Sequence, residues 1–429
     1  MFNSLRTFSS LFAATLIFYI GNGLLNTVVS SRLAMEGFST TTNGVVLSSY
    51  YTGLLAGSFV CHRLIQGIGH IRAFAVFGAT TTAITLLYGL YLSPWFWSIL
   101  RFSNGITIFG LLMIIESWLN ECSESHYRGR VFSIYMTLLY MGISIGQLLL
   151  NVGEVRGQEL FIISGIVFSL CLIPVSATRG VHPCLPETKP YRFMVIFRKA
   201  PIGMLGSLAA GLASSAFFAM TPVLCTAIGL SLYHLSWIMS LTVFCGLAAQ
   251  WLIGILSDRF DRTMIMAVVA TTMTAVSWIM FLDRGTSFGK LAVGMGLFGA
   301  LLFAIYPVAV ARAHDVFGGQ DSVAVSAGLL FAYSTGACVS PLLASGVMTL
   351  LDSPFGLFAF WGSTGGILAV LTIYLRKHER VAVVPLEDQV PFVLMESTSP
   401  VIMALEPMGK SNTDNKKEHT KPGEPKQPL

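Results

Sequence analysis

The sequence predicts an all-α polytopic membrane protein with twelve transmembrane helices arranged as two six-helix halves. Three observations lead to this fold class. The 429 residues are 54% hydrophobic and only 11% charged, with a mean hydropathy of +0.71, whereas a soluble domain carries about 25% charged residues. Apolar runs long enough to cross a hydrocarbon core of about 30 Å recur along the chain. Lys and Arg residues gather in alternate connections, as the positive-inside rule requires.

Twelve apolar runs define the expected helices. The first six lie at 8–30, 44–62, 71–92, 95–118, 131–151 and 160–178, and the second six at 202–226, 235–256, 264–282, 290–312, 323–350 and 356–376. We therefore divide the chain into an N-terminal half (1–178), a cytoplasmic inter-half loop (179–201), a C-terminal half (202–376) and a cytoplasmic tail (377–429). The tail is rich in Pro, Lys, Glu, Ser and Thr, so part of it is expected to be disordered.

The orientation follows from the distribution of positive charge. An even number of helices places both termini on one side of the membrane. Sixteen Lys and Arg residues fall on that side and only four on the other, which are Arg32, Arg156, Arg284 and Lys290. Both termini are therefore predicted to be cytoplasmic in a bacterial inner membrane. The first apolar run is too long for the core of a cleaved signal and is expected to span the membrane.

The halves repeat weakly, and one loop carries a motif. Gly142 and Gly336 are 194 positions apart, close to the spacing of the loops that end the second and eighth helices. The string Gly254-x-Leu-Ser-Asp258-Arg259-x-x-Arg262 resembles the loop motif G-x-L-a-D-R-x-G-R of the major facilitator superfamily. Arg101-x-x-x-Gly105 in the fourth helix matches that superfamily's R-x-x-x-G motif. The resemblance implies two parallel six-helix repeats and secondary transport by alternating access.

The loop motif also departs from the pattern. Asp261 stands where the motif has its second glycine, and in the first-half copy Gln66 and Gly67 replace the Asp and Arg. By resemblance, Asp258, Arg259 and Arg262 act at the inner gate, which should depend more on this second copy than is usual. The alternative is that the three residues are ordinary interfacial charges.

Further strings resemble a subgroup, the YcaD-like facilitators, over residues 8 to about 407. They are Leu25-Asn-Thr-Val28, Arg32-x-x-x-Glu36-Gly37, Ile115-Glu-Ser-Trp-Leu-Asn120, Arg128-Gly-Arg130, Gly146-Gln-Leu148, Gln250-Trp251, Tyr306-Pro307 and Thr398-Ser-Pro400. The subgroup resemblance fixes the expected fold but no substrate.

Ionisable residues at membrane depth are costly and mark candidate functional sites. Arg101 lies inside the fourth helix and needs an anionic or carbonyl partner, for which Glu36 is a candidate, although Glu36 could pair locally with Arg32 instead. Glu116 lies near the inner end of the same helix. It could form a gating latch with Arg128 and Arg130 of the next loop, or be a carboxylate held there only for stability.

Polar side chains inside spans should face the interior rather than lipid. Asn22 and Asn26 share a face of the first helix, and the other candidates are Gln147, Gln250, Tyr306 and Tyr333. With Arg101 they form the predicted set for substrate binding or coupling, and Arg32, Glu36, Glu116, Arg128, Arg130, Asp258, Arg259 and Arg262 the predicted gating set. For any one polar group, interhelical bonding that only packs the bundle is an equal alternative.

The predicted function is secondary active transport of a small solute, for which Arg101 favours an anionic or carbonyl-bearing molecule. Proton coupling is implied by the resemblance alone, and facilitated or sodium-coupled transport stays open. The rival interpretation is a solute sensor that signals through its C-terminal tail. An enzyme is not expected, because Gly142-x-Ser144-x-Gly146 falls inside a helix rather than at a strand–helix turn. The seven cysteines show no metal-ligand spacing, so no metal or cofactor is expected. We expect a monomer in contact with lipid, without nucleic acid.

Overall fold

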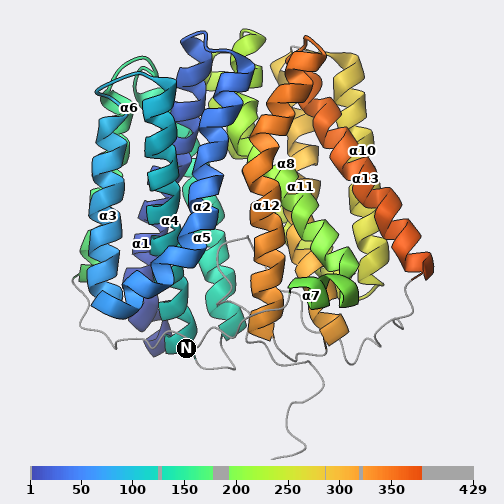
Figure 1. Cartoon of the computed structure of the whole chain (residues 1–429), viewed down its shortest axis with the longest axis horizontal. Helices are drawn as coiled ribbons and strands as arrows, with labels where there is room; N and C mark the ends of the chain where they lie inside the picture. The colour runs from blue at the N-terminus through green and yellow to red at the C-terminus, as the bar shows by residue number, and fades with distance from the viewer. Residues whose placement is uncertain (1, 124–127, 177–192, 286, 318–321, 379–429) are drawn as a thin grey trace, which may run out of the picture.

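The computed structural model describes residues 2–123, 128–176, 193–285, 287–317 and 322–378, and these form a bundle of upright helices (Figure 1). The first half contains α1 (Phe2–Met35), α2 (Thr40–Ile68), α3 (His70–Leu87), α4 (Pro94–Cys122), α5 (Arg128–Leu148), the short 3₁₀ turn η1 (Leu149–Val152) and α6 (Glu159–Ser176). The second contains α7 (Phe193–Lys199), α8 (Pro201–Ala227), α9 (Leu232–Ser257), α10 (Arg262–Asp283), α11 (Phe288–Phe317), α12 (Ser322–Leu350) and α13 (Gly356–His378).

The helices confirm the predicted all-helical membrane architecture. Within the described ranges, 11 helices are long and apolar enough to cross a membrane, and α6 is a shorter apolar helix. With 18 residues, α6 rises about 27 Å at about 1.5 Å per residue, close to the thickness of the hydrocarbon core. Most of the other helices are longer than the sequence predicted, because their polar ends continue the helix beyond the apolar run.

The two halves pair their helices in the same way. In the first half α1 packs on α5, α2 on α4, and α3 on α6. The equivalent pairs in the second half are α8 with α12, α9 with α11, and α10 with α13, and each is among the closest contacts of the molecule. The weak sequence repeat therefore corresponds to a repeated arrangement of six helices.

Glycines at equivalent positions allow the closest of these approaches. A Cβ added at Gly142 of α5 would press against the Leu16 carbonyl of α1, and one at Gly336 of α12 would collide with the Leu208 carbonyl of α8. The glycine positions are 194 residues apart and the carbonyls 192 apart. The repeat thus preserves a backbone-to-backbone contact that a side chain would block.

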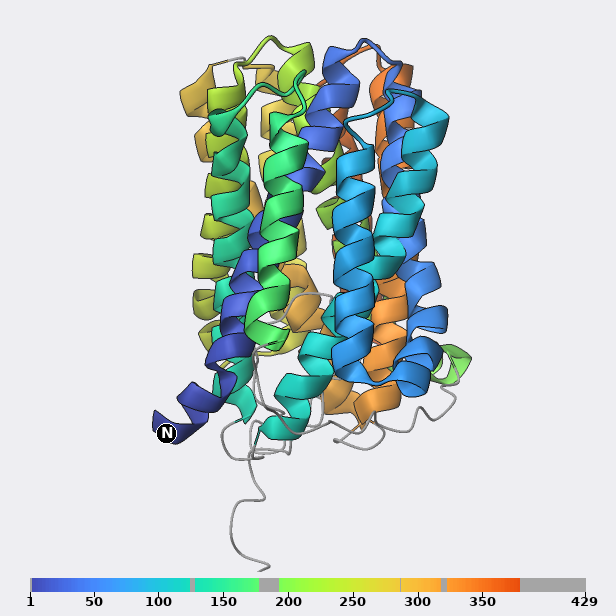
Figure 2. The same cartoon turned by 90° about the vertical axis from the view of Figure 1, so that its left-hand side faces the viewer.

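The most extensive contacts between the halves join α1 with α8, α2 with α12, and α5 with α9. We call the end of the bundle that carries the N-terminus, at the bottom of Figures 1 and 2, the N-terminal side, and the opposite end the far side. Toward the far side, the Ser30 hydroxyl of α1 donates to the Ala219 carbonyl of α8. The Asn151 amide donates to Ser236 Oγ of α9 at 2.7 Å, and Gly44 of α2 lies against Ser345 of α12.

The segment predicted as the inter-half loop is partly helical. Residues 193–199 form α7 at the N-terminal side, where its buried Ile196 lies against Gly328 of α12. The next helix starts at Pro201, whose fixed φ suits the first turn of a helix. The predicted disorder of the tail and the Thr398-Ser-Pro400 string lie outside the described residues.

Candidate functional site

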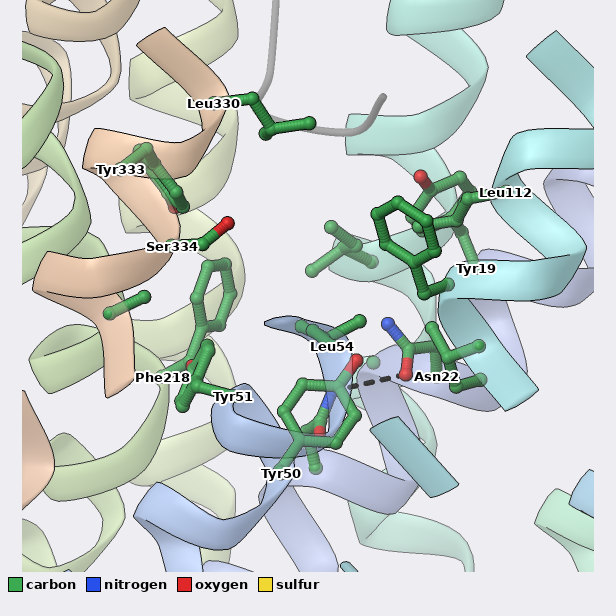
Figure 3. A pocket seen from close by; sticks show the side chains of 16 residues that line it. Tyr19, Asn22, Tyr50, Tyr51, Leu54, Leu112, Phe218, Leu330, Tyr333 and Ser334 are labelled. Atoms are coloured by element: carbon green, nitrogen blue, oxygen red, sulfur yellow. Dashed lines mark hydrogen bonds between the residues drawn. The ribbon is translucent and has the colours of Figure 1, made fainter. Parts of the chain in front are cut away.

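A cavity lies between the halves at the centre of the bundle. Its volume is about 100 Å³, and six helices from both halves line it. Its lining residues are Tyr19, Asn22, Gly23, Asn26, Tyr50, Tyr51, Leu54, Ile108, Phe109, Leu112, Ile143, Phe218, Leu330, Tyr333, Ser334 and Ala337 (Figure 3). Most of this wall is aromatic or aliphatic, and its polar groups are two amides and several hydroxyls. This is the composition expected of a small-molecule site.

Arg101 stands behind the wall of this cavity rather than on it. Its side chain is only 2% exposed and lines a smaller adjoining pocket together with Asn26, Tyr50, Phe218 and others. Its Nη1 donates to Asn26 Oδ1 at 2.6 Å, and its guanidinium lies 5.3 Å from the centroid of the Tyr50 ring. Within the described residues, Arg101 makes no ion pair, and its Nε has no hydrogen-bond partner.

The amide of Asn26 continues this contact into the main cavity. Asn26 Nδ2 donates to Asn22 Oδ1 at 3.1 Å, one helical turn along α1. The predicted pair of asparagines on one face of the first helix therefore lies at the cavity, and Asn22 and Asn26 both line it. Arg101 and the two amides therefore lie side by side, and their role in substrate binding or coupling stays a prediction.

Glu36 does not reach Arg101. Its carboxylate pairs with Arg32 Nε at 2.8 Å, the local i, i+4 alternative that the sequence left open. Arg32 also donates to the Val155 carbonyl, and Arg156 to the Met35 carbonyl. These contacts tie the far end of α1 to the α5–α6 connection of the same half. Their gating role stays a prediction.

Gln250 belongs to the seam between the halves. It is fully buried, and its Nε2 donates to the Tyr140 hydroxyl of α5 at 2.6 Å and to the Phe303 carbonyl of α11 at 2.7 Å. Gln147, also fully buried, has no hydrogen-bond partner for either amide atom within the described residues. Neither residue lines the cavity, so their predicted role in substrate binding is left without a direct contact surface in this conformation.

Tyr306 and Tyr333 meet across the second half. Their rings lie 5.2 Å apart between centroids in an edge-to-face arrangement. Tyr333 lines the cavity, and Tyr306 packs behind it. Tyr333 is therefore placed to touch a solute, whereas Tyr306 is placed to support it.

The loop motif forms an ion-pair network inside the second half. Arg262 is 1% exposed and bonds Asp258 and Asp315, each at 2.9 Å. Asp261, the departure from the motif, accepts from the Thr263 amide as the N-cap of α10 and pairs with Arg376 of α13 at 3.0 Å. Arg259 is exposed. Asp258 bonds Arg262 of its own half, and its gating role remains a prediction.

Glu116 of α4 is fully buried, near the N-terminal side of the bundle. The Tyr135 hydroxyl of α5 donates to its Oε1 at 2.8 Å. Arg130 is exposed, and the side chain of Arg128 lies outside the described residues. The latch between Glu116 and these arginines therefore stays a prediction.

Sequence reasoning missed most of the aromatic wall and one acid. Tyr50, Tyr51 and Phe218 line the cavity, but aromatic residues in an apolar helix carry no positional signal that separates a cavity from lipid. Asp315 could have been found, because a carboxylate near the inner end of a predicted span is rare. It was overlooked because the expected span ended at residue 312.

The family follows from a match over most of the chain. The family model of the Major Facilitator Superfamily matches residues 11–233 and 203–406. The chain belongs to the major facilitator superfamily. Among curated proteins, it is 28% identical over 352 residues to the uncharacterized MFS-type transporter YcaD of Salmonella paratyphi A, covering 81% of this chain and 90% of that protein. The YcaD protein of Salmonella typhi is 28% identical over 342 residues, covering 79% and 88%.

Solved structures share the fold at low sequence identity. The nucleoside transporter NupG superposes with a TM-score of 0.67 at 13% identity, covering 87% of this chain and 99% of NupG. A D-xylose-proton symporter gives 0.65 at 15% identity, covering 85% and 97%. A bacterial homologue of the human lysosomal transporter Spinster, in an inward-facing and unoccupied conformation, gives 0.65 at 15% identity, covering 90% and 98%.

Membership of this superfamily confirms the predicted fold class, the YcaD-like resemblance and the assignment as a multi-pass membrane transporter related to bacterial proteins. Because the family is typically non-enzymatic, it also confirms that the chain is a transporter rather than an enzyme. A small-molecule solute is implied by the same membership.

Proposed function

We propose that this transporter moves a small solute carrying an anionic or carbonyl oxygen, and that Arg101 determines this preference. The observation that supports the proposal is a buried guanidinium without an ion-pair partner among the described residues, next to the central cavity. A buried charge costs several kcal/mol unless it is paired. One amide oxygen, one distant carbonyl and a tyrosine ring offset only part of that cost, so an anion entering the cavity gains from a field that is already in place.

The state of the protein supports alternating access. Besides the Gln250–Tyr140 bond deeper in the bundle, the close contacts at Ser30–Ala219, Asn151–Ser236 and Gly44–Ser345 hold the halves together toward the far side. With both termini cytoplasmic, as the positive-inside rule favours, this arrangement corresponds to an inward-facing conformation in a bacterial inner membrane. Rocking one half against the other would separate these contacts and expose the same cavity to the outside.

Proton coupling is proposed with Glu116 as the proton-carrying group. Among the described residues Glu116 and Asp315 are the buried carboxylates, and Asp315 bonds the permanently charged Arg262. Glu116 accepts a bond from the Tyr135 hydroxyl, a contact between α4 and α5 that a change in its protonation would alter. Gating by the Asp258 loop at the cytoplasmic side is proposed on the resemblance to the loop motif.

The test is a ligand-induced thermal-shift screen of the purified protein in detergent. Organic anions, neutral sugars and hydrophobic cations are compared at two pH values on wild type, Arg101→Met and Glu116→Gln. Stabilisation by anions that disappears in Arg101→Met supports the proposal. Stabilisation by cations or neutral solutes alone, or anion effects that Arg101→Met retains, contradicts the assigned solute class. In Glu116→Gln, the pH dependence of the shift should vanish while the preference for anions persists.

A further inference from the structure

We propose that Asn22 is the specificity-determining contact for the solute, and that its amide Nδ2 donates a hydrogen bond to an acceptor oxygen of that solute. Arg101 is then a positioning residue that acts through Asn26. The inference rests on the proposed function and deepens it, because it names the atom that distinguishes acceptor-bearing from donor-bearing molecules.

The direction of the amide chain is fixed by the charge at its end. A guanidinium can only donate hydrogen bonds, so Asn26 must turn its Oδ1 toward Arg101, as the 2.6 Å contact requires. The Asn26 Nδ2 then faces Asn22 and can only donate. Asn22 must therefore turn its Oδ1 toward Asn26, at 3.1 Å. The oxygen and nitrogen of a lone amide are hard to distinguish, but here a reversed amide would oppose two donors.

One amide nitrogen remains at the end of this chain. Figure 3 shows the nitrogen of Asn22 on the opposite side of its amide from the dashed bond, toward the open centre of the cavity. Asn22 is 9% exposed and lines the cavity. The Arg101–Asn26–Asn22 hydrogen-bond series thus places the amide donor of Asn22 at the cavity wall, while the amide oxygen of Asn22 faces Asn26. Hydrogen bonds in series polarise one another, so the positive charge of Arg101 strengthens this donor.

The Tyr51 hydroxyl donates to the Ser215 carbonyl at 3.5 Å. The other hydroxyls of the cavity, on Tyr19, Tyr50, Tyr333 and Ser334, have no such fixed direction and can either donate or accept. They can satisfy a solute of either kind and do not discriminate. Asn22 therefore carries the choice between acceptor and donor, whereas the aromatic and aliphatic wall fits an apolar body. A small carboxylate or carbonyl compound with a planar apolar body meets both demands.

The experiment uses two probes of the same ring and similar size, benzoate and benzylammonium. Their dissociation constants are measured by thermal-shift titration in detergent at neutral pH. The probe concentration rises to about 50 mM, which covers the weak end of small-ligand binding. The chains are wild type, Asn22→Leu, Asn26→Asp and Arg101→Met. Ser49→Ala, a half-buried position whose hydroxyl bonds the Val45 carbonyl of its own helix, is the control.

Each variant has a distinct expected result. Wild type and Ser49→Ala prefer benzoate. Asn22→Leu preserves the side-chain volume at position 22 and leaves the charge of Arg101 in place, but it removes the amide donor. Benzoate binding should therefore weaken roughly 10- to 100-fold, the range for a hydrogen bond to a charged group. In Asn26→Asp, the new carboxylate still satisfies Arg101 but can only accept. Asn22 then turns its Nδ2 toward that carboxylate and its Oδ1 toward the cavity, and the preference reverses toward benzylammonium.

The outcomes separate this inference from the proposed function. If benzoate stabilises wild type, Arg101→Met loses the effect and Asn22→Leu binds benzoate within about threefold of wild type, the anion preference stands and the role of Asn22 is overturned. If wild type prefers benzylammonium or binds neither probe, both proposals are contradicted. Unfolding temperatures of the unliganded variants close to that of wild type confirm that each chain is folded.

Discussion

The turns that end α2 and α9 occupy equivalent places in the two halves, yet they are held by different forces. At the α9–α10 turn, Arg262 is buried between Asp258 and Asp315. At the α2–α3 turn, Gly69 adopts a φ of +84°, and the equivalent of Arg262 is His70, whose buried ring packs 6.4 Å from the Trp118 ring centroid.

The difference indicates where electrostatic control of the inner side is concentrated. The salt bridges of Arg262 with Asp258 and Asp315 stabilise the α9–α10 turn, so the geometry of this turn depends on all three charges. Aromatic packing stabilises the other turn, and packing tolerates small displacements without leaving a charge uncovered. The loss of the Asp and Arg from the first-half motif is thus matched by a change of interaction type, and the helix pairing around it is preserved.

Removing Arg262 should have the largest effect on this comparison. In Arg262→Met the buried Asp315 loses its 2.9 Å partner, and the free energy of unfolding should fall by about 3–5 kcal/mol, as for other broken buried pairs. Chemical or thermal unfolding of the purified protein in detergent measures the loss. Arg259→Met, at an exposed position of the same turn, is the matched control and should change stability by less than about 0.5 kcal/mol.

A loss below about 1 kcal/mol in Arg262→Met would remove the claim that charge, rather than packing, holds the second turn. An equal loss in Arg259→Met would point to a general effect of lowering positive charge at this side of the bundle. Either result would erase the contrast between the two turns.

Removing the equivalent His70 should have an intermediate effect. His70→Ala deletes a buried ring and its contact with Trp118, so we expect a loss of about 1–2 kcal/mol. The same unfolding assay, repeated at about 50 mM and about 500 mM salt, between which the Debye length shrinks roughly threefold, sharpens the result. The His70→Ala loss should not depend on salt, and a marked salt dependence would place charge at both turns.

Restoring the missing motif glycine should have the smallest effect. Asp261→Gly removes the N-cap of α10, which a glycine replaces at a cost of a few tenths of a kcal/mol, and the partly exposed pair with Arg376, which contributes about 0–1 kcal/mol. A total loss of about 0.5–1 kcal/mol is expected in the unfolding assay. Stabilisation in Asp261→Gly would mean that the departure from the motif is not compensated by these two contacts.

The sequence carried most of the fold but only part of the site, for physical reasons. Hydropathy and the distribution of Lys and Arg predict spans and sides because lipid imposes a strong, local demand on every helix. The asparagine pair on one face of α1 was found because helical periodicity places Asn22 and Asn26 together. The contact between Arg101 and Asn26 was not predicted, because the two residues are 75 positions apart in the sequence. They meet through tertiary packing, which leaves no local pattern in the sequence.

Aromatic cavity residues were missed for a related reason. Aromatic residues such as Tyr50 and Phe218 also occur at lipid-facing positions. Only the arrangement of the six lining helices distinguishes these cavity residues from lipid-facing ones. The alternative partners of Glu36 show the same limit. The i, i+4 pairing with Arg32 was foreseeable as a local geometry, but the choice between it and Arg101 required the distance across the bundle.

The central claim is that Arg101 makes this transporter selective for solutes that carry an acceptor oxygen. It is tested most directly by transport of the most strongly stabilising anion into proteoliposomes that contain either wild type or Arg101→Met at equal amounts. The account predicts uptake by wild type and at least a roughly tenfold lower rate with Arg101→Met, which corresponds to about 1.4 kcal/mol. Equal rates for the two proteins would contradict it.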